Sequence, residues 1–194
     1  MTHRASEEQI EMVLSYCKGK NVVDFGSGGL EWSFFLADSL RPDGNTVLSV
    51  DRYDPPASYV APGYLSYNLM HKKSYFVDLT PEDVSGYDVG FISWPPCYNT
   101  YNLPDLLDTF DLVIYQGCNV QGTACGSERL WESFRRREVL EYIPKLNNTL
   151  IVYGAPCERR EQDDLYPEEI AATHKDEIFP FNDSRETLNQ LLDK

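Results

Sequence analysis

The chain has 194 residues, of which 42% are hydrophobic, and this suits a single globular domain with a substantial core. Its 17 basic and 31 acidic residues give a formal net charge of -14. The average field around the protein therefore repels phosphate backbones and anionic lipid surfaces, which argues against nucleic acid as a partner and against a membrane.

The first 51 residues predict a leading helix and then a βαβ unit. Ser6 and Gln9 have the spacing of a capping box, and apolar residues recur at helical spacing until Gly19. NVVDFGSGG (21–29) predicts a strand that runs into a glycine turn, LEWSFFLADSL (30–40) predicts a helix, and TVLSVD (46–51) predicts a second strand.

The next segment is less regular. Residues 54–73 have no clean period, so we expect an irregular segment or a poorly marked crossover helix. SYFVDL (74–79) then predicts a third strand, and TPEDVSG (80–86) predicts a short turn or helix with Thr80 as its N-cap.

The second half continues the alternation of strands and helices. YDVGFISW (87–94) and DLVIYQG (111–117) predict the fourth and fifth strands, with a crossover helix at 102–110 between them. SERLWESFRRR (127–137) predicts a helix with its three arginines at a solvated end, where they compensate the helix dipole. EVLEYIPKLNNTLIVYG (138–154) predicts two strands joined at Asn147 and Asn148, and the alternative extends the helix to Tyr142.

These elements predict an α/β fold: a Rossmann-like, doubly wound, mostly parallel seven-stranded sheet with a C-terminal antiparallel hairpin strand. We expect one domain over residues 1–156, with the leading helix included, and an acidic C-terminal appendage over residues 157–194.

A glycine turn lies where the first strand gives way to a helix. There Gly26 and Gly28 let the backbone turn tightly and leave room for a ligand. A dinucleotide fingerprint would require a third glycine where this chain has Glu31, and a carboxylate beside a pyrophosphate is unfavourable. NAD or FAD is therefore the weaker interpretation of the turn.

The stretch from Asp24 through Gly26 to Gly28 resembles the first motif of class I S-adenosylmethionine-dependent methyltransferases. Asp51, at the end of the second strand, extends the resemblance, because this family places there an acid that accepts hydrogen bonds from both ribose hydroxyls. Asp78 follows the predicted third strand, where the family often places a polar group near the adenine amino group; the alternative is a turn or helix-capping aspartate. The resemblance implies S-adenosyl-L-methionine as cofactor, bound by Asp24, Gly26, Ser27, Gly28, Asp51 and Asp78.

The fourth strand ends at SWPPCY (93–98), the place of the family's fourth motif beside the methyl donor. Amino-group methyltransferases carry Asp, Asn or Ser directly before the two prolines, whereas this chain carries Trp94, whose indole only donates a hydrogen bond. The stretch is similar to that of little-characterised methyltransferase-like proteins with a Ser-Trp-Pro-Pro corner, with no established substrate. The candidate residues for orienting a methyl acceptor are Ser93, Trp94, Pro95 and Tyr98.

Further candidates surround this corner. Trp94, Tyr98 and Tyr101 are candidates for an aromatic wall around a flat or cationic substrate, with core or rim packing as the alternative. The polar loop after the fifth strand adds candidate pocket residues at Gln116, Asn119, Gln121 and Cys125, with a plain connecting loop as the alternative.

The five cysteines are an odd number and form no C-x-x-C pair, so the sequence predicts reduced thiols and no metal site, although Cys118 and Cys125 are close enough in sequence to approach one another. The first residues lack the apolar core of a signal peptide, and no stretch reaches the roughly 18 apolar residues of a membrane span. We therefore expect a cytoplasmic protein.

Three functions follow from these observations. The leading hypothesis is an S-adenosylmethionine-dependent methyltransferase that acts on a small molecule or a protein side chain. The second is a catalytically degenerate domain of the same fold that holds the cofactor or a partner protein, with Trp94 filling the acceptor pocket. The third is an NAD-dependent oxidoreductase, which Glu31 disfavours.

Overall fold

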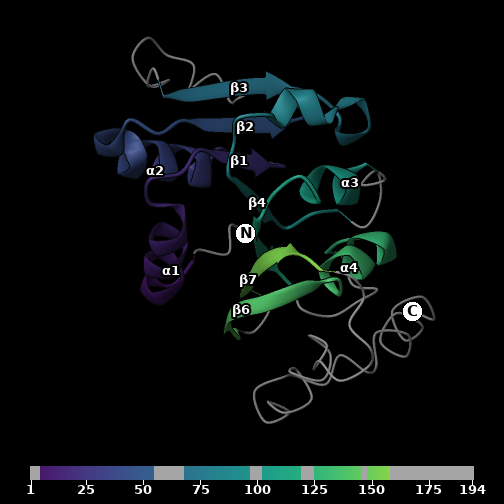
Figure 1. Ribbon diagram of the computed structural model, residues 1–194. Coiled ribbons are helices and arrows are strands. Elements are labelled where there is room, and N and C mark those ends of the chain that lie inside the picture. Colours follow the sequence, from purple (N-terminus) through teal and green to yellow (C-terminus); the bar gives the residue numbers. More distant parts are fainter. Residues whose placement is uncertain (1–4, 55–67, 97–101, 119–124, 146–147, 158–194) are drawn as a thin grey trace, which may run out of the picture.

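A single mixed sheet organises the chain (Figure 1). The computed structural model describes residues 5–54, 68–96, 102–118, 125–145 and 148–157. The strands are β1 (Val22–Phe25), β2 (Val47–Asp51), β3 (Leu69–Lys73), β4 (Val89–Ser93), β5 (Leu112–Gly117), β6 (Arg137–Ile143) and β7 (Thr149–Pro156). The helices are α1 (Glu7–Cys17), α2 (Glu31–Leu40), α3 (Leu103–Leu107) and α4 (Glu128–Phe134), with the 3-10 helices η1 (Arg41–Asp43), η2 (Phe76–Asp78) and η3 (Pro81–Val84).

The seven strands follow the order β3-β2-β1-β4-β5-β7-β6. The strands from β3 to β5 in this order are mutually parallel, whereas β7 is antiparallel to both β5 and β6. This arrangement confirms the predicted fold class, including the antiparallel hairpin at the C-terminal side of the sheet. It brings the carboxyl ends of β1, β2, β4 and β5 to one edge, where ligands bind in doubly wound sheets.

Two hydrophobic clusters hold the layers together, one on each face of the sheet. One cluster joins α1 and α2 to the sheet, and the other joins α3 and α4 to the opposite face (Figure 1). Strands β1, β5 and the first part of β7 are buried along their length, as expected for strands covered on both faces. The sheet is therefore a rigid support for the residues at its carboxyl edge.

The local signals at several helix starts are confirmed. Ser6 and Gln9 form the expected capping box at the start of α1, and Ser127 caps α4 by accepting from the Leu130 amide at 3.3 Å. Thr80 and Asp83 form a second capping box, which starts η3. These short-range signals were predictable because each depends only on residues three positions apart.

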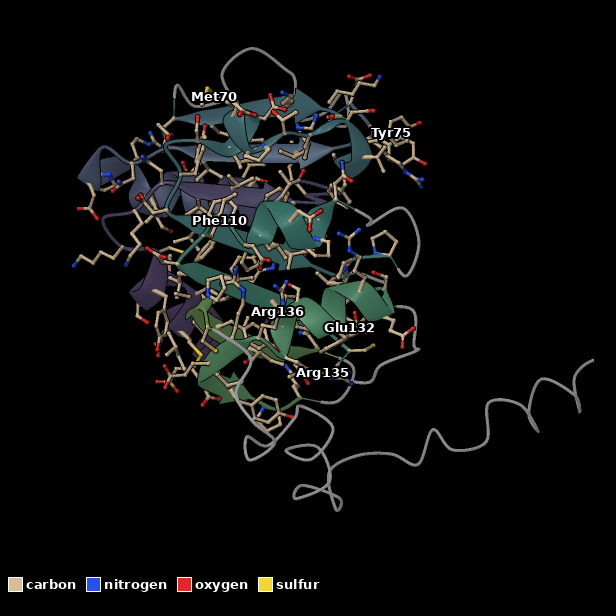
Figure 2. The ribbon with its side chains drawn as sticks, turned by 45° about the vertical axis from the view of Figure 1, so that its right-hand side comes forward. Met70, Tyr75, Phe110, Glu132, Arg135 and Arg136 are labelled. Atoms are coloured by element: carbon tan, nitrogen blue, oxygen red, sulfur yellow. The ribbon has the colours of Figure 1, made fainter. Side chains whose placement is uncertain are left out.

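The predicted third strand is wrong. Residues 74–79 contain η2, and the third strand is β3, five residues earlier in the chain. Among the described strands, β3 lies at the edge and pairs only with β2, and its exposed Met70 projects outward (Figure 2). An edge strand buries little, so its sequence lacks an apolar pattern. The segment SYFVDL resembles a buried strand in sequence because its Phe76 packs against the core, although the segment lies outside the sheet.

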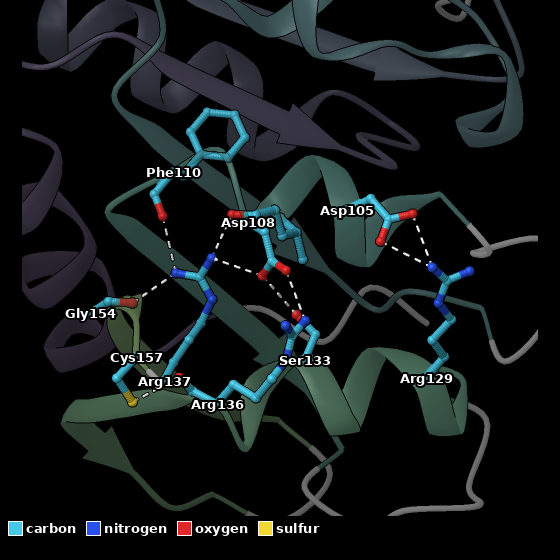
Figure 3. A network of polar contacts seen from close by, with 10 residues as sticks. Asp105, Asp108, Phe110, Arg129, Ser133, Arg136, Arg137, Gly154 and Cys157 are labelled. Carbon is cyan, nitrogen blue, oxygen red and sulfur yellow. Dashed lines mark hydrogen bonds and ion pairs between the residues drawn. The ribbon is translucent and has the colours of Figure 1, made fainter. Parts of the chain in front are cut away.

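The alternative helix extending to Tyr142 is also wrong, as is the interpretation of all three arginines as a solvated helix end. Helix α4 ends at Phe134, and Arg137 begins β6 with only 5% of its surface exposed. Its guanidinium donates to the carbonyl oxygens of Phe110 at 3.0 Å, Gly154 at 2.7 Å and Leu107 at 2.6 Å (Figure 3). Asp108 balances the charge at 3.5 Å. Arg137 therefore joins α3, the start of β5 and β7.

Of the described helices, none has both the length and the apolar character needed to cross a membrane. The acidic segment that was expected to form an appendage lies outside the described residues, except for Cys157, whose amide donates to the Arg136 carbonyl at 2.8 Å.

Replacing Arg137 by Met tests this junction. The variant removes the guanidinium from three buried carbonyls, of which that of Leu107 keeps the Phe110 amide as a donor at 3.0 Å, so we expect the free energy of unfolding to fall by about 2–4 kcal/mol. The matched control is Arg129→Met, which removes an exposed ion pair with Asp105 and is expected to cost at most about 1 kcal/mol. Urea unfolding followed by circular dichroism measures both. Equal losses in the two variants would show that the buried guanidinium contributes no more than a surface pair.

Candidate functional site

The turn between β1 and α2 has a strongly constrained backbone. Gly26 and Gly28 have φ angles of 74° and 49°, and Leu30 also has a positive φ of 64°. The amides of Gly26 and Ser27 both donate to the Val50 carbonyl, at 2.8 and 3.2 Å. The turn is thus fixed to β2, and glycine is needed at the two positions where a side chain would meet left-handed backbone.

Asp51, the last residue of β2, holds the same turn from its side chain. One carboxylate oxygen accepts from the Gly28 amide at 2.9 Å, and the other accepts from the Tyr53 amide at 3.0 Å. Each oxygen keeps a further lone pair. The carboxylate is therefore oriented by the backbone and can still accept hydrogen bonds from a ligand.

A row of hydrogen bonds runs beneath this turn. The Ser27 and Ser49 hydroxyls are 2.6 Å apart, Ser49 lies 2.9 Å from His71 Nδ1, and His71 Nε2 lies 3.1 Å from the Tyr53 carbonyl. A carbonyl only accepts, so in the tautomer that fits both contacts the imidazole donates from Nε2 and accepts from Ser49 at Nδ1. Ser27 is thereby tied through β2 and β3 to the segment that follows Asp51.

A cavity of about 280 Å³ opens at the carboxyl edge of the sheet. Its walls come from the glycine turn, from the residues after β2 and β3, and from the corner after β4. Tyr75 projects at its outer rim (Figure 2). The described residues that line it are Gly26, Gly28, Asp51, Arg52, Tyr53, Ser74, Tyr75, Phe76, Trp94 and Pro96.

Aromatic side chains dominate this lining. The Phe76 ring lies so close to the turn that a Cβ added at Gly26 would come within 3.3 Å of it. Tyr53 and Tyr75 are 61% and 54% exposed, and the Arg52 guanidinium lies 4.5 Å from the centre of the Tyr53 ring. Flat faces with one acidic group between them suit a ligand that has an aromatic ring and hydroxyl groups.

Asp24 lies beneath the cavity and does not line it. Its side chain has no exposed surface, and one carboxylate oxygen accepts from the Ser33 hydroxyl at 2.5 Å. The other oxygen has no hydrogen-bond partner among the described residues. Burial raises the pKa of Asp24 from 3.8 to about 7, the Ser33 hydrogen bond opposes this, and the negative charge of Asp51 adds to it.

The corner after β4 is built around Trp94. This residue has a φ of 50°, which is unusual for a bulky side chain, and its amide donates to the Gln116 carbonyl at 2.8 Å. The Gln116 side chain accepts from Trp32 Nε1 at 2.6 Å and is 1% exposed. Gln116 therefore connects α2, β5 and the corner from within the core.

The two prolines are joined to the start of α4. The Pro95 carbonyl accepts from the Gly126 amide at 2.7 Å, and Pro96 forms an isolated β-bridge with Cys125. Pro96 lines the cavity, whereas Pro95 and Ser93 are not among its described lining residues. Ser93 lies in register with Gln116 at the end of β4.

The structure thus brings together only part of the predicted site. Gly26, Gly28, Asp51 and Trp94 meet around one cavity, while Asp24 and Ser27 support it from below. Asp78 is exposed in η2 and is not among the described lining residues, because the strand that was expected to place it lies earlier in the chain. The remaining candidates, Tyr98, Tyr101, Asn119 and Gln121, lie outside the described residues.

Sequence reasoning missed the residues that follow β2 and β3. Arg52 and Tyr53 come directly after Asp51, and Ser74, Tyr75 and Phe76 come directly after β3. The signal that could have found them is their place after two neighbouring parallel strands. This signal was missed because the predicted third strand covered residues 74–79, and three of these residues line the cavity.

The buried Asp24 predicts a specific pH dependence of stability. Because its pKa is raised on folding, the folded state binds a proton that the unfolded state releases, so this contribution to stability is lost as the pH rises from about 4 to about 7. We expect Asp24→Asn, which does not ionise, to gain stability relative to the wild type by about 1.4 kcal/mol per pH unit over that window, reaching about 4 kcal/mol above pH 7. Denaturant titrations at several pH values measure the difference.

A second variant checks the cause of this trend. The Ser33 hydroxyl lowers the pKa of Asp24, so Ser33→Ala should extend the loss of stability to higher pH. A difference between Asp24→Asn and the wild type that stays constant with pH would contradict the assignment of this proton to Asp24.

Comparison with known proteins gives similarity in structure only. No family model matches the sequence, and no curated protein matches it. A putative O-methyltransferase from Klebsiella pneumoniae has 12% sequence identity over 81% of this chain and 84% of that chain, with a TM-score of 0.59. A putative tRNA (m1A22) methyltransferase from Streptococcus pneumoniae has 13% identity over 98% of this chain and 89% of that chain, with a TM-score of 0.57.

The same streptococcal protein in complex with S-adenosyl-L-methionine has 14% identity over 81% of this chain and 76% of that chain, with a TM-score of 0.54. Together with the strand order, these similarities show that the chain has a Rossmann-like fold, which it shares with these solved structures.

Proposed function

We propose that this protein binds S-adenosylmethionine in the cavity between the glycine turn and Trp94, and transfers its methyl group to a small molecule or a protein side chain. The observation that carries the proposal is the position of Asp51. Its carboxylate lines the cavity at the end of β2, is held by two backbone amides and keeps lone pairs for the two hydroxyls of a ribose.

The remaining walls fit the other parts of this cofactor. The aromatic rings of Tyr53, Tyr75 and Phe76 offer faces on which an adenine can stack. Gly26 and Gly28 leave space beside the turn because they carry no Cβ. One oxygen of Asp24 has no partner among the described residues, and in its ionised form this carboxyl adds negative charge beneath the turn, which suits a ligand with an ammonium and a sulfonium group.

The corner after β4 supplies the acceptor side of the proposed site. Bound S-adenosylmethionine supplies an electrophilic methyl group, so the chain needs only to align a nucleophile and exclude water. We assign this positioning to Ser93, Trp94, Pro95 and Tyr98, and Trp94 is the one of them that lines the cavity in the described part of the chain. The Pro95 carbonyl already accepts from Gly126 and keeps one lone pair for an acceptor group.

Cofactor binding is tested by calorimetric titration with S-adenosylmethionine and S-adenosylhomocysteine. Asp51→Ala removes both proposed ribose hydrogen bonds, and we expect the dissociation constant to rise by at least about 100-fold, since hydrogen bonds to charged groups contribute about 1.5–3 kcal/mol each. The matched control is Asp78→Ala, an exposed carboxylate outside the described lining, for which we expect less than a threefold change.

The outcomes of this titration separate the hypotheses. An equal loss in the two variants would assign Asp78 to the adenine side, as the sequence resemblance implied. No heat with either cofactor at millimolar concentration would reject the proposal. An enhanced NADH fluorescence on mixing would then favour the oxidoreductase.

Methyl transfer itself needs a separate measurement. We expect the wild-type protein to transfer the labelled methyl group of S-adenosylmethionine to a component of a cell extract, and we expect Asp51→Ala to lose the label. The label should be sought in small molecules, proteins and RNA separately, because one structural neighbour is a putative tRNA methyltransferase. Cofactor binding without transfer in any extract would favour the degenerate domain with Trp94 in the acceptor space.

A further inference from the structure

Two thiols that are not in a disulfide meet beside the Pro-Pro corner. Cys118 directly follows β5 and is half-buried, whereas Cys125 precedes α4 and is 1% exposed. The Cys118 thiol hydrogen-bonds the Cys125 thiol, and this contact together with burial raises the pKa of Cys125. The geometry agrees, because the Cys125 sulfur lies 3.6 Å from the place of a Cβ on Gly117, the residue before Cys118. The two thiols are therefore close, although six residues separate them in the sequence.

The surrounding contacts hold the backbone on both sides of this pair. The Tyr115 hydroxyl donates to the Cys118 carbonyl, and Trp131 Nε1 donates to the Cys125 carbonyl at 3.1 Å. A Cβ added at Gly117 would lie 2.6 Å from the Tyr115 hydroxyl oxygen and 3.6 Å from the Cys125 sulfur. Glycine at this position thus permits the close packing of the Tyr115 hydroxyl and the Cys125 sulfur against the end of β5.

We propose that Cys118 and Cys125 are a redox-active dithiol, which closes to an intramolecular disulfide on reaction with a small disulfide such as oxidised glutathione. The half-buried Cys118 is the thiol that such an oxidant reaches first. Within the described residues, no cluster of three or more Cys, His, Asp or Glu side chains is placed to hold a metal, so thiol–disulfide chemistry suits this pair better than metal binding.

The exchange proceeds in two balanced steps. The Cys118 thiolate attacks oxidised glutathione, forms a mixed disulfide and releases one glutathione thiolate, which takes up the proton that Cys118 lost. Cys125 then loses its proton and attacks the Cys118 sulfur, so that the protein disulfide forms and a second glutathione leaves. The protein loses two electrons and two protons, and one oxidised glutathione becomes two reduced ones. The raised pKa of Cys125 lowers its thiolate fraction and so slows the second step.

The pair is joined to the candidate site by backbone contacts. Cys125 forms the β-bridge with Pro96, and the next amide, that of Gly126, donates to the Pro95 carbonyl. A covalent link from Cys118 to Cys125 therefore connects the end of β5 to the corner after β4. Formation of this disulfide therefore constrains the backbone beside Trp94, on the side of the cavity opposite Asp51.

The test counts thiols in the full-length chain. The reduced protein is equilibrated in glutathione buffers from fully reduced to fully oxidised, quenched with acid, alkylated under denaturing conditions and weighed by mass spectrometry. We expect all five cysteines to be alkylated in the reduced buffer and two fewer in the oxidised one, with the two thiols lost together and no glutathione retained. Neither step requires the cofactor, so the result is independent of the proposed methyl transfer.

Three variants identify the pair. Cys118→Ala and Cys125→Ala should each abolish the paired loss, and Cys125→Ala should instead retain one glutathione on Cys118. Cys97→Ala is the matched control and should behave as the wild type. If replacing the buried Cys125 prevents folding, the half-exposed Cys118 still decides the question. A wild type that keeps every thiol in the oxidised buffer, or a paired loss that survives in Cys118→Ala or disappears in Cys97→Ala, would overturn the proposal.

Discussion

The site depends on how the chain leaves β1. Three residues with positive φ angles, Gly26, Gly28 and Leu30, follow Phe25 within five positions. The amides of Gly26 and Gly28 donate to residues of β2, whereas the Leu30 amide donates to the Ser27 carbonyl within the turn. Because Asp51 accepts from Gly28, the ends of the two strands are joined by a charged hydrogen bond as well as by the sheet. A change in the backbone of the turn would consequently reorient the Asp51 carboxylate, and a change at Asp51 would release the turn.

The opposite wall of the cavity is supported by a different part of the fold. Trp94 is held by Gln116 at the end of β5, and the two prolines are held by the segment that leads into α4. Arg137 in turn joins the strand that follows α4 to α3. One side of the cavity thus rests on β1, β2 and β3, and the other side rests on β4, β5 and the helices that follow them.

Most of the fold could be predicted from the sequence because its signals are local. Capping boxes and buried strands such as VVDF and LVIYQ carry their own patterns, and the glycine turn is marked by residues two positions apart. Strand β3 could not be found in the same way, since an edge strand with one buried residue has no pattern to detect.

The buried position of Arg137 could not be predicted for a related reason. Its guanidinium is bound mainly by backbone carbonyls, and every residue type has a backbone carbonyl, so the sequence does not show which ones it meets. The place of Tyr75 and Phe76 in the cavity wall was missed for the same reason. These residues line the cavity because they follow β3, and the sequence gives no pattern for that strand.

The row of hydrogen bonds under the turn has a direction, and this direction has a chemical consequence. It starts from the Tyr53 carbonyl, which can only accept, so the His71 ring, the Ser49 hydroxyl and the Ser27 hydroxyl each donate toward that end when the ring is neutral. The Ser27 proton is thereby committed inward, and its oxygen offers only lone pairs to whatever lies against the turn. A pyrophosphate, itself rich in lone pairs, gains no hydrogen bond from such an oxygen, whereas an N–H or O–H group does. With a neutral ring, the Ser27 hydroxyl thus contributes an acceptor, and not a donor, to the side of the turn that it faces.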